Sequence, residues 1–540
     1  MLMRPMQRGI AFRPLATLGS LAALGLAIAL LAPPVLAAKA GARPKQAAGP
    51  AAPIKTGLEN LEKQVKEFTL PNGLKFIVVE RHDAPVFSFQ TVVNAGSCDE
   101  QVGTTGLAHM MEHMAFKGST VVGTSDWKAE KPALDAEEQA WGALLAERRR
   151  GIHADTTRLR ELEKAFTAAQ EASRKYVVSN QWSKILEQAG AQDMNAFTAD
   201  DITAYYYSVP SNRLELWAVM EGGRLTRPVF REFYKERDVV YEERRMRVES
   251  SPMGRLFMEF IQAAFTSHPY GNGGIGTPSE LKTFSRTQGD AFFREHYVAG
   301  NMACAVVGDV SVPELQPVAA RYFGDIPSGP VPPPVDTVEP EQKAERRVIL
   351  EDPAQPVVIM AWHIPGATDP AYAAHKALAD LIGGGDHARL NKALVKERKI
   401  ATQLQAFTGM PGEKYPGLFG IFAIPAAGQD PLVVEQAVYA VLDSIQSVKP
   451  LTADELAGYK VRVRAGKIGA VENNLSLAGE LAQAQTLHGD WRQFFREQER
   501  VQALQADDLM AAMKRSLIKS NRTVGLIVNP PKQASNEGGR

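Results

Sequence analysis

Two histidines and a glutamate stand close together in the segment GLAHMMEHMAFKGS, residues 106–119. On a helix, His109 and His113 lie one turn apart on one face, so both imidazoles can bind the same zinc ion. Glu112 lies on that side as well and can take a proton from water activated by the metal without being a ligand. The spacing therefore indicates a hydrolytic zinc site. The alternative is an ordinary helix that happens to contain two histidines.

A catalytic zinc site needs a third protein ligand and an open position for water. The best candidates lie in YKERDVVYEERRMRVES, residues 234–250, which is strongly helical in pattern. Glu236 and Glu243 share one helical stripe, so this pair can supply a ligand and a supporting carboxylate. Glu242 points about 100° away and is expected in solvent. Taken alone, the segment is more typical of a salt-bridged surface helix.

The elements that must position these residues belong to a large soluble protein. With 540 residues the chain is too long for one core, so at least two domains are expected. A formal net charge of zero argues against a general nucleic-acid binder. Asn72-Gly73 between two strand-like runs predicts a β-hairpin. A predicted buried strand, VFSFQTVVNAG, then leads toward the histidine helix.

The second part of the chain repeats the first. Two long charged segments between residues 124 and 182 predict a helical hairpin, and the Pro-rich stretch SGPVPPPVDTVEPEQ predicts a linker. After the linker, YAAHKALADLIGGG aligns with GLAHMMEHMAFKGS and places His375 opposite His109. Leu378 and Ala379 then stand opposite the glutamate and the second histidine. This pattern indicates an internal duplication whose second copy has lost the polar cluster.

These features predict an α+β fold. It consists of two homologous α/β-sandwich domains, each an antiparallel-rich sheet with helices on one side, and a helical hairpin is inserted in the first. The expected borders are a signal peptide at 1–37, a flexible tether at 38–62, an N-terminal domain with the zinc site at 63–327 (insertion 124–182), a Pro-rich linker at 328–346, a C-terminal homologous domain without the site at 347–530, and a tail at 531–540.

The N-terminus is typical of a secretory signal peptide. Arginines precede an uncharged run at residues 15–31, and small residues follow, with cleavage expected after Ala37 or Ala40. An uncleaved anchor is the alternative, although the run is near the lower limit for spanning a bilayer. We expect an exported protein, periplasmic in a Gram-negative source and otherwise extracellular, with no stable membrane span after cleavage. Cys98 and Cys304 are too few for a disulfide scaffold and are expected to be unpaired, with a single disulfide as the alternative.

The order H-x-x-E-H is the inverzincin signature, and E-R-x-x-x-x-x-E follows it here. With these motifs, residues 65–530 resemble the pitrilysin/insulinase family of zinc metallopeptidases, which includes the mitochondrial processing peptidase. The bacterial two-domain members are the most similar. The resemblance implies an endopeptidase with one zinc ion per chain, held by His109, His113 and Glu243. It also implies Glu112 as general base and Glu236 as a supporting residue. The interval between the two motifs is longer than usual by about the length of the hairpin, which we interpret as an insertion.

A second family feature concerns the substrate. The segment GAQDMNAFTADDITAYYYSVP, residues 190–210, resembles the family's N-A-[FY]-T strand. The resemblance implies that Asn195, Ala196 and Phe197 contact an extended peptide substrate by β-augmentation. The alternative is an ordinary strand with Phe197 in the core.

One family feature is missing. Self-sufficient relatives carry an arginine and a tyrosine, seven residues apart, that hold the substrate backbone. Here Val395 and Thr402 stand at those places. Some bacterial relatives divide the labour between a zinc-bearing subunit and a homologous partner that supplies this pair. The resemblance therefore implies that this chain is the zinc-bearing subunit of such an assembly, with a homodimer as the other arrangement.

Two other functions are compatible with parts of the sequence. A non-catalytic subunit is one, although the first copy keeps the complete motif that degenerate relatives lose. A copper-binding protein is the other, because Met110 and Met114 flank the histidines. On a helix these methionines lie off the histidine face, so they are expected in the core. The sequence does not decide whether the hairpin is a lid, a partner-docking arm or a spacer.

Overall fold

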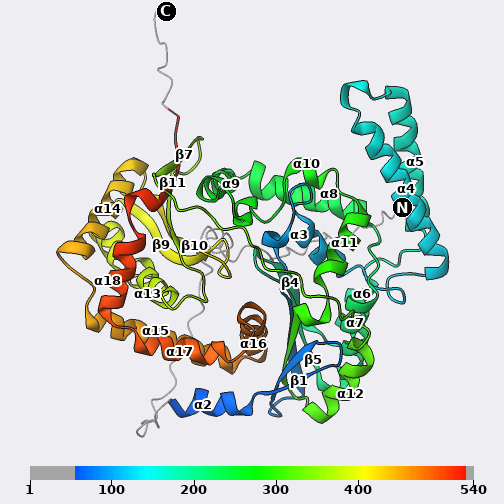
Figure 1. Ribbon diagram of the computed structural model, residues 1–540, viewed down its shortest axis with the longest axis horizontal. Helices are drawn as coiled ribbons and strands as arrows, with labels where there is room; N and C mark the ends of the chain where they lie inside the picture. Colours follow the sequence, from blue (N-terminus) through cyan, green and yellow to red (C-terminus); the bar gives the residue numbers. More distant parts are fainter. Residues whose placement is uncertain (1–54, 531–540) are drawn as a thin grey trace, which may run out of the picture.

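The computed structural model of the protein describes residues 55–530, and a mixed sheet forms the centre of each half (Figure 1). The strands of the first sheet are ordered β1-β2-β6-β3-β5-β4. All neighbours are antiparallel except β2 and β6. The strands are β1 (Lys66–Thr69), β2 (Lys75–Glu80), β3 (Val86–Val93), β4 (Gln192–Thr198), β5 (Thr203–Pro210) and β6 (Met302–Gly308). The predicted hairpin joins β1 to β2, and Gly73 adopts the positive φ of 100° that its turn requires.

The second sheet has the order β7-β11-β8-β10-β9, with β7 and β11 parallel and the other pairs antiparallel. Its strands are β7 (Arg346–Glu351), β8 (Val357–Ile364), β9 (Ala401–Met410), β10 (Gly417–Pro425) and β11 (Arg522–Val528). In order and in direction, these five strands correspond one by one to β2, β6, β3, β5 and β4 of the first sheet. The α+β class with two homologous sandwich domains is therefore confirmed, while the borders drawn between them stay predictions.

Helix α2 (Lys55–Gln64) precedes β1, and the other α-helices lie in the connections between these strands. In the first half they are α3 (Leu107–Met114), α4 (Trp127–Arg148), α5 (Thr156–Arg174), α6 (Gln181–Gln188), α7 (Leu214–Thr226), α8 (Phe233–Arg244), α9 (Pro252–Ala264), α10 (Pro278–Leu281), α11 (Arg286–His296) and α12 (Val312–Phe323). In the second half they are α13 (Tyr372–Gly383), α14 (Pro431–Ser447), α15 (Ala453–Glu472), α16 (Asn474–His488), α17 (Gln493–Ala503) and α18 (Ala506–Ser516).

The helices of each half cover one face of its own sheet. A helix from the other half of the chain covers the second face (Figure 1). Leu477 and Leu481 of α16, from the second half, pack against the first sheet in one apolar cluster. In return, Leu256 and Phe260 of α9, from the first half, pack against the second sheet. Because burial of apolar surface is the main stabilising term, this exchange of helices holds the halves together.

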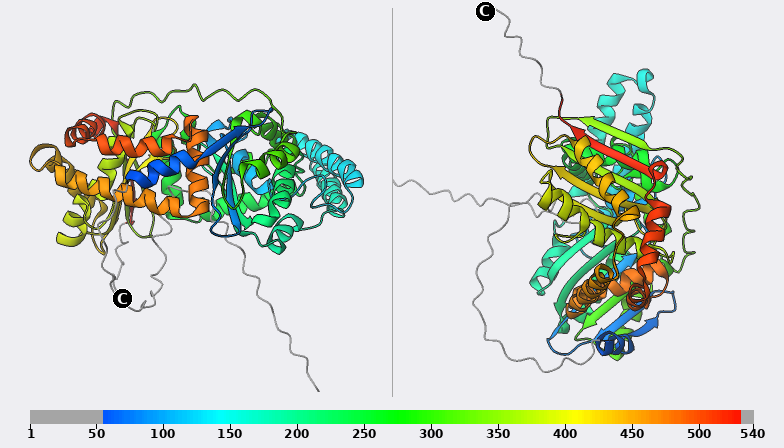
Figure 2. Two further views of the ribbon diagram at one scale, coloured as in Figure 1. Left: turned by 90° about the horizontal axis from the view of Figure 1, so that it is seen from below. Right: turned by 90° about the vertical axis from the view of Figure 1, so that its left-hand side faces the viewer.

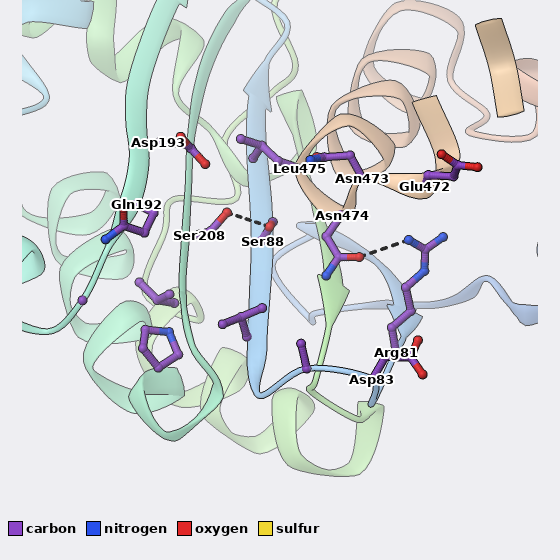
Figure 3. Close-up of a pocket in the computed structure, with 15 residues that line it drawn as sticks. Arg81, Asp83, Ser88, Gln192, Asp193, Ser208, Glu472, Asn473, Asn474 and Leu475 are labelled. Atoms are coloured by element: carbon purple, nitrogen blue, oxygen red, sulfur yellow. Dashed lines mark hydrogen bonds between the residues drawn. The ribbon is translucent and has the colours of Figure 1, made fainter. Parts of the chain in front are cut away.

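Polar contacts also join the halves, around a cavity of about 490 Å³ between the first sheet and the start of α16 (Figure 3). Arg81 donates from Nη1 to Oδ1 of Asn474 at 3.0 Å and from Nη2 to the carbonyl of Val471 at 2.7 Å. On the sheet side, the hydroxyls of Ser88 and Ser208 lie 2.7 Å apart. Arg81 therefore links the loop after β2 to the end of α15 and the start of α16.

The region before the first sheet differs from the expectation. The tether predicted over 38–62 is helical from Lys55 onward, as part of α2. Leu58 and Leu61, three residues apart on this helix, pack against the cluster beneath α16. This apolar pair on one face is the physical reason for the helix. The predicted signal peptide, the rest of the tether and the tail lie outside the described residues.

The described residues contain no helix that is both long and apolar enough to cross a membrane. Their two cysteines are unpaired, as predicted. Cys98 is buried in a short 3₁₀ turn, Ser97–Asp99, and Cys304 is buried in β6. Neither cysteine therefore stabilises the fold through a disulfide.

The predicted helical pair is present as α4 and α5, which run side by side and project from the first half (Figures 1 and 2). Its base is closed by an antiparallel bridge between Thr124 and Val177. Ser125 N–H donates to the carbonyl of Tyr176 at 2.8 Å, close to that bridge. That this pair is an insertion relative to other proteins stays a prediction.

A buried ion pair fastens this base to the loop that follows α3. Arg231, 1% exposed, donates to both carboxylate oxygens of Glu130 in α4 at 2.8 and 3.2 Å. The same guanidinium donates to the carbonyls of Ser119 and Val122 at 2.8 and 3.0 Å, and to that of Lys117. Arg231 thus ties the base of the helical pair to the segment that leaves α3.

Replacing Glu130 by alanine is expected to lower the free energy of unfolding by about 3–5 kcal/mol, because Arg231 would stay buried without its anion. Lys131→Ala provides the control, since its ion pair with Asp135 is exposed and is expected to contribute less than about 1 kcal/mol. Chemical denaturation of both variants measures the difference. Equal stabilities would contradict the role given to Arg231.

Candidate metal centre

Helix α3 begins with two features that fix its position. Gly106 at its N-cap has a φ of 99°, a conformation that favours glycine. A side chain there would also meet Leu281, whose Cδ2 would lie 2.9 Å from the added Cβ. The carboxylate of Glu100 accepts hydrogen bonds from the N–H groups of Gly106 at 2.8 Å and Ala108 at 2.7 Å. These bonds satisfy donors that a helix start leaves free, so they hold the turn that precedes His109.

Helix α8 packs against α3 and brings two glutamates to the histidines. Oε2 of Glu243 lies 3.8 Å from Nε2 of His109 and 3.4 Å from Nε2 of His113. Oε1 of Glu236 lies 3.6 Å from the other ring nitrogen of His113, Nδ1. One ligand atom from each of His109, His113 and Glu243 lies within 4.8 Å of the others. As expected, Glu242 is exposed, and it pairs with Arg245 instead.

These three residues fit a zinc ion. Two ligands of tetrahedral zinc lie about 3.3 Å apart, which is close to the separations between Glu243 and the two imidazoles. Neither ring nitrogen of buried His109 has a hydrogen-bond partner among the described residues. Such unpaired buried groups are costly unless something binds them. Two imidazoles and one carboxylate form a donor set that catalytic zinc sites use with a fourth position open.

The methionines beside the histidines take no part in this cluster. Met110 is fully buried and Met114 is 1% exposed, and both belong to the main core of the first half. A copper site would need their thioethers as soft ligands. Because both methionines lie in the core, a copper ion bound by the histidines would lack the thioether ligands of Met110 and Met114.

The metal-free cluster carries a proton on one of its two histidines. Burial would lower the pKa of His113, but its contacts with Glu236 and Glu243 outweigh burial and raise this pKa to about 9. Burial, together with the charge on His113, lowers the pKa of His109 to about 3. His109 is thus already in the neutral form that a metal ligand needs, and His113 must lose a proton to become one.

Glu112 differs from the other carboxylates of the site. It is 5% exposed, and its Oε2 is buried without a hydrogen-bond partner among the described residues. Burial raises its pKa to about 7, although the charge of His113 and the hydroxyl of Thr198 oppose the rise. A carboxylate with a pKa near 7 can accept and release a proton at neutral pH, as a general base must.

Two cations that were not among the predicted site residues support the glutamates of α8. Nζ of Lys117 lies 2.6 Å from Oε2 of Glu236, and Nη2 of Arg247 lies 2.7 Å from Oε1 of Glu243. Burial would raise the pKa of both carboxyls, but these cations and the histidines lower each to about 2. Both carboxylates are therefore charged at neutral pH. The signal that could have found the cations is their spacing, since each stands four residues after a predicted site residue.

A cavity of about 500 Å³ adjoins the cluster. Glu112, His113 and Glu236 form one side of it. Its other walls come from the end of α3, the segment after α5, the start of α6 and the edge strand β4, and include Phe116, Lys117, Val177, Val178, Trp182, Lys184, Met194 and Asn195. The candidate metal centre therefore opens into a space large enough for substrate side chains, and the base of the helical pair forms part of its wall.

Strand β4 is an edge of the first sheet, paired only with β5 among the described residues. It carries the three residues predicted to contact substrate. Ala196 is 1% exposed and packs in the core that also contains α3, whereas Phe197 points to the opposite face and packs against the cluster beneath α16. Asn195 is half-buried beside the cavity. Phe197 thus contributes to a core, as the alternative interpretation held, and the substrate-binding role stays a prediction.

The second half repeats the helix but not the cluster. His375 on α13 corresponds to His109, yet its ring nitrogens are satisfied by the carbonyl of Ala371 and the hydroxyl of Ser516, each at 2.9 Å. Val395 lies partly buried against the second core, and Thr402 is exposed at the start of β9. This half therefore provides neither the cluster nor an Arg/Tyr pair at those positions.

Comparisons with known families agree with this division. Residues 75–130 match the family described as Insulinase (Peptidase family M16), and residues 283–462 match the one described as Peptidase M16 inactive domain. The zinc protease PqqE of Helicobacter pylori (strain ATCC 700392 / 26695) is 24% identical over 428 residues, which is 77% of this chain and 82% of that protein. The first match contains the complete H-x-x-E-H motif, and the second covers the helix that lacks it.

Solved structures share the fold. A protease from Helicobacter pylori matches with a TM-score of 0.71 and 21% identity over 86% of this chain and 99% of that one. The first half of the periplasmic protease PqqL from Escherichia coli matches with a TM-score of 0.62 and 17% identity, over 87% of this chain and 92% of that one. In the complete PqqL chain the match covers 48% of the length. In its two matched segments, the chain is thus similar to the peptidase M16 family, the insulinase and pitrilysin family, and a zinc protease is among its relatives.

Proposed function

We propose that this protein is an exported zinc endopeptidase that cleaves peptides or unfolded polypeptide segments. The observation that carries the proposal is the convergence of Nε2 of His109, Nε2 of His113 and Oε2 of Glu243 beside the buried carboxylate of Glu112. His109, His113 and Glu243 would hold one zinc ion. The name of the relative PqqE, a zinc protease, supports this assignment.

A zinc ion held there would supply Lewis acidity toward a peptide carbonyl and would lower the pKa of water. Glu112 is the group that takes the proton from the attacking water and delivers it to the leaving amine nitrogen. Glu236 holds His113 from the side opposite Glu243, so that Nε2 of the imidazole points at the ligand position. Arg247 keeps Glu243 charged and in place.

The substrate would lie along the open edge of β4. An extended peptide added to this edge would make main-chain hydrogen bonds with the strand that carries Asn195, Ala196 and Phe197. Its side chains would reach the adjoining cavity of about 500 Å³. An unfolded segment can add as a strand in this way, whereas a folded protein cannot, so peptides and unfolded chains are the proposed substrates.

The chain would act as the zinc-bearing subunit with a homologous partner that supplies an Arg/Tyr clamp, or as a homodimer. Val395 and Thr402 in place of that pair support this arrangement. A second support comes from PqqL, whose complete chain is about twice the length that this chain matches. Export, to the periplasm of a Gram-negative source, is supported by the signal-like N-terminus and by the description of PqqL as periplasmic.

The test is cleavage of a mixed peptide library, followed by mass spectrometry. The purified chain is assayed as isolated, after chelation, and after zinc is added back, each with and without the candidate partner. Zinc-dependent cleavage in either arm would support the peptidase. A zinc-loaded chain that cleaves nothing in both arms would contradict it and favour a non-catalytic subunit.

Zinc binding is expected to release about one proton at pH 7. His113, with a pKa raised to about 9, is protonated in the metal-free chain and must be neutral as a ligand. The apparent zinc affinity should therefore fall about tenfold for each unit by which the pH drops below about 9, until further groups titrate. Calorimetry in two buffers of different ionisation enthalpy measures the released protons. Release of no protons at pH 7 would contradict the protonation assigned to His113.

A further inference from the structure

Two corresponding turns, one from each half, meet near the candidate metal centre. Residues 199–202 join β4 to β5 in the first half, and residues 411–416 join the matching strands β9 and β10 in the second. Asp201, 5% exposed, lies at the contact. Its carboxylate accepts hydrogen bonds from the backbone N–H groups of Glu413 at 2.7 Å and Lys414 at 3.0 Å. The second half thus docks its turn on one buried carboxylate of the first.

The same carboxylate is held from within the first half. The hydroxyl of Tyr270, which is fully buried, donates to Oδ1 of Asp201 at 2.6 Å and accepts from the N–H of Tyr415 at 3.2 Å. Nζ of Lys414 donates to Oδ1 of Asn94, just after β3, at 2.8 Å. Because two backbone N–H groups and a buried hydroxyl converge on this one side chain, the turn of the second half has a fixed position.

From this contact, backbone hydrogen bonds lead to the start of α3. The N–H of Ser97 donates to the carbonyl of Ala199 at 3.2 Å, and that of Cys98 donates to the carbonyl of Asp200 at 3.0 Å. Three residues after Ser97 stands Glu100, whose carboxylate accepts from the N–H groups of Gly106 and Ala108 at the start of α3, directly before His109. Displacement of the 199–202 turn would therefore displace the start of the helix that carries His109 and Glu112.

A second route leads along β4. The N–H of Ala199 donates to the carbonyl of Ile202 at 2.8 Å and closes the turn directly after that strand. Thr198, its last residue, is 5% exposed, and β4 packs against α3, the helix that carries Glu112. The contact at Asp201 thus fixes the end of the strand proposed to receive the substrate.

We propose that Asp201 is a positioning residue through which the second half, itself without a metal cluster, holds α3 and β4 in their working geometry. The consequence of this positioning for catalysis rests on the proposed function. The structural coupling of Asp201 to α3 and β4 does not. The second half would then be required for an ordered site, and not only as a cover for the first sheet. Asparagine at this position would weaken the coupling. Its single carbonyl oxygen can face either the two N–H groups or the hydroxyl of Tyr270, and its NH₂ then faces the donors at the other place.

The chain offers a matched control in Asp352, which also forms a contact between the halves. Asp352 follows β7 and pairs with Arg255 of α9. Both belong to elements that pack on the second sheet, away from α3. Asp201→Asn and Asp352→Asn therefore make the same chemical change at two contacts between the halves, and only the first contact is joined to α3 and β4 by the hydrogen bonds described above.

Hydrogen exchange of the full-length chain, read by mass spectrometry over residues 106–114 and 192–198, tests the coupling without any activity. Asp201→Asn is expected to speed exchange in both segments about tenfold, which corresponds to an opening about 1.4 kcal/mol easier. Asp352→Asn is expected to leave both segments unchanged. In a chain that cleaves peptides, Asp201→Asn should also lower kcat about 10-fold to 100-fold, with KM changed less.

Unchanged exchange in Asp201→Asn, or equal changes in the two variants, would overturn the proposal, because Asp201 would then act only as an ordinary interface contact. Failure of the natural chain to cleave any peptide would count against the proposed function alone. The exchange result would still decide whether Asp201 positions α3 and β4.

Discussion

A chain with Glu112→Gln is expected to bind zinc as the natural chain does and to hydrolyse peptides about 10²-fold to 10⁴-fold more slowly. Glutamine has nearly the shape of glutamate but cannot take a proton from water. Oε2 of Glu112 has no hydrogen-bond partner among the described residues, so the exchange breaks no bond that the fold needs at that atom. The loss should therefore appear in kcat, with stability and zinc content retained.

The assay compares initial rates at equal zinc content, with the partner present if the chain needs one. Glu242→Gln is the control, since this side chain is exposed on α8, within the same segment as Glu243, and pairs only with Arg245 among the described residues. It is expected to keep the natural rate within about twofold. Equal rates for Glu112→Gln and the natural chain would show that another group is the base.

A chain with His109→Ala is expected to bind zinc at least about 100-fold more weakly. His109 supplies one of three ligand atoms, and the remaining pair, His113 and Glu243, cannot complete a tetrahedral site. The substitution also removes a buried imidazole whose nitrogens have no hydrogen-bond partner within residues 55–530, so the metal-free fold should tolerate it. Zinc competition with a chelator of known affinity measures the effect.

The matched control is His375→Ala, at the corresponding position of α13. His375 is bonded to Ala371 and Ser516, so its loss is expected to reduce stability without changing zinc affinity. Retained zinc affinity in His109→Ala would contradict the assignment of the cluster. Equal loss in both variants would indicate general unfolding instead.

The local features of the candidate site could be predicted from the sequence. The positions of His109, Glu112 and His113 on one helix follow from periodicity, because a helix returns to the same face after three or four residues. The same rule places Glu236 and Glu243 on one stripe but cannot rank them. Only the family resemblance favoured Glu243 as the ligand. The structure separates them by atom, since Glu243 faces Nε2 of both histidines and Glu236 faces Nδ1 of one.

Contacts between distant segments could not be predicted. Nothing in the sequence near α16 indicates that Leu477 and Leu481 pack on the first sheet, and Asp201 gives no sign of binding a turn more than 200 residues away. These contacts depend on how two sheets are placed in space, which no local period encodes. The helix α2 was missed for a related reason. Two leucines are too weak a pattern until the surface they cover is known.

The central claim is that His109, His113 and Glu243 bind one zinc ion. Anomalous scattering from a crystal of the zinc-loaded chain, measured on both sides of the zinc absorption edge, tests it most directly. The account predicts one peak, about 2.0–2.2 Å from Nε2 of each histidine and from Oε2 of Glu243. A peak bound elsewhere, or a fully loaded crystal without a peak at these three atoms, would contradict it.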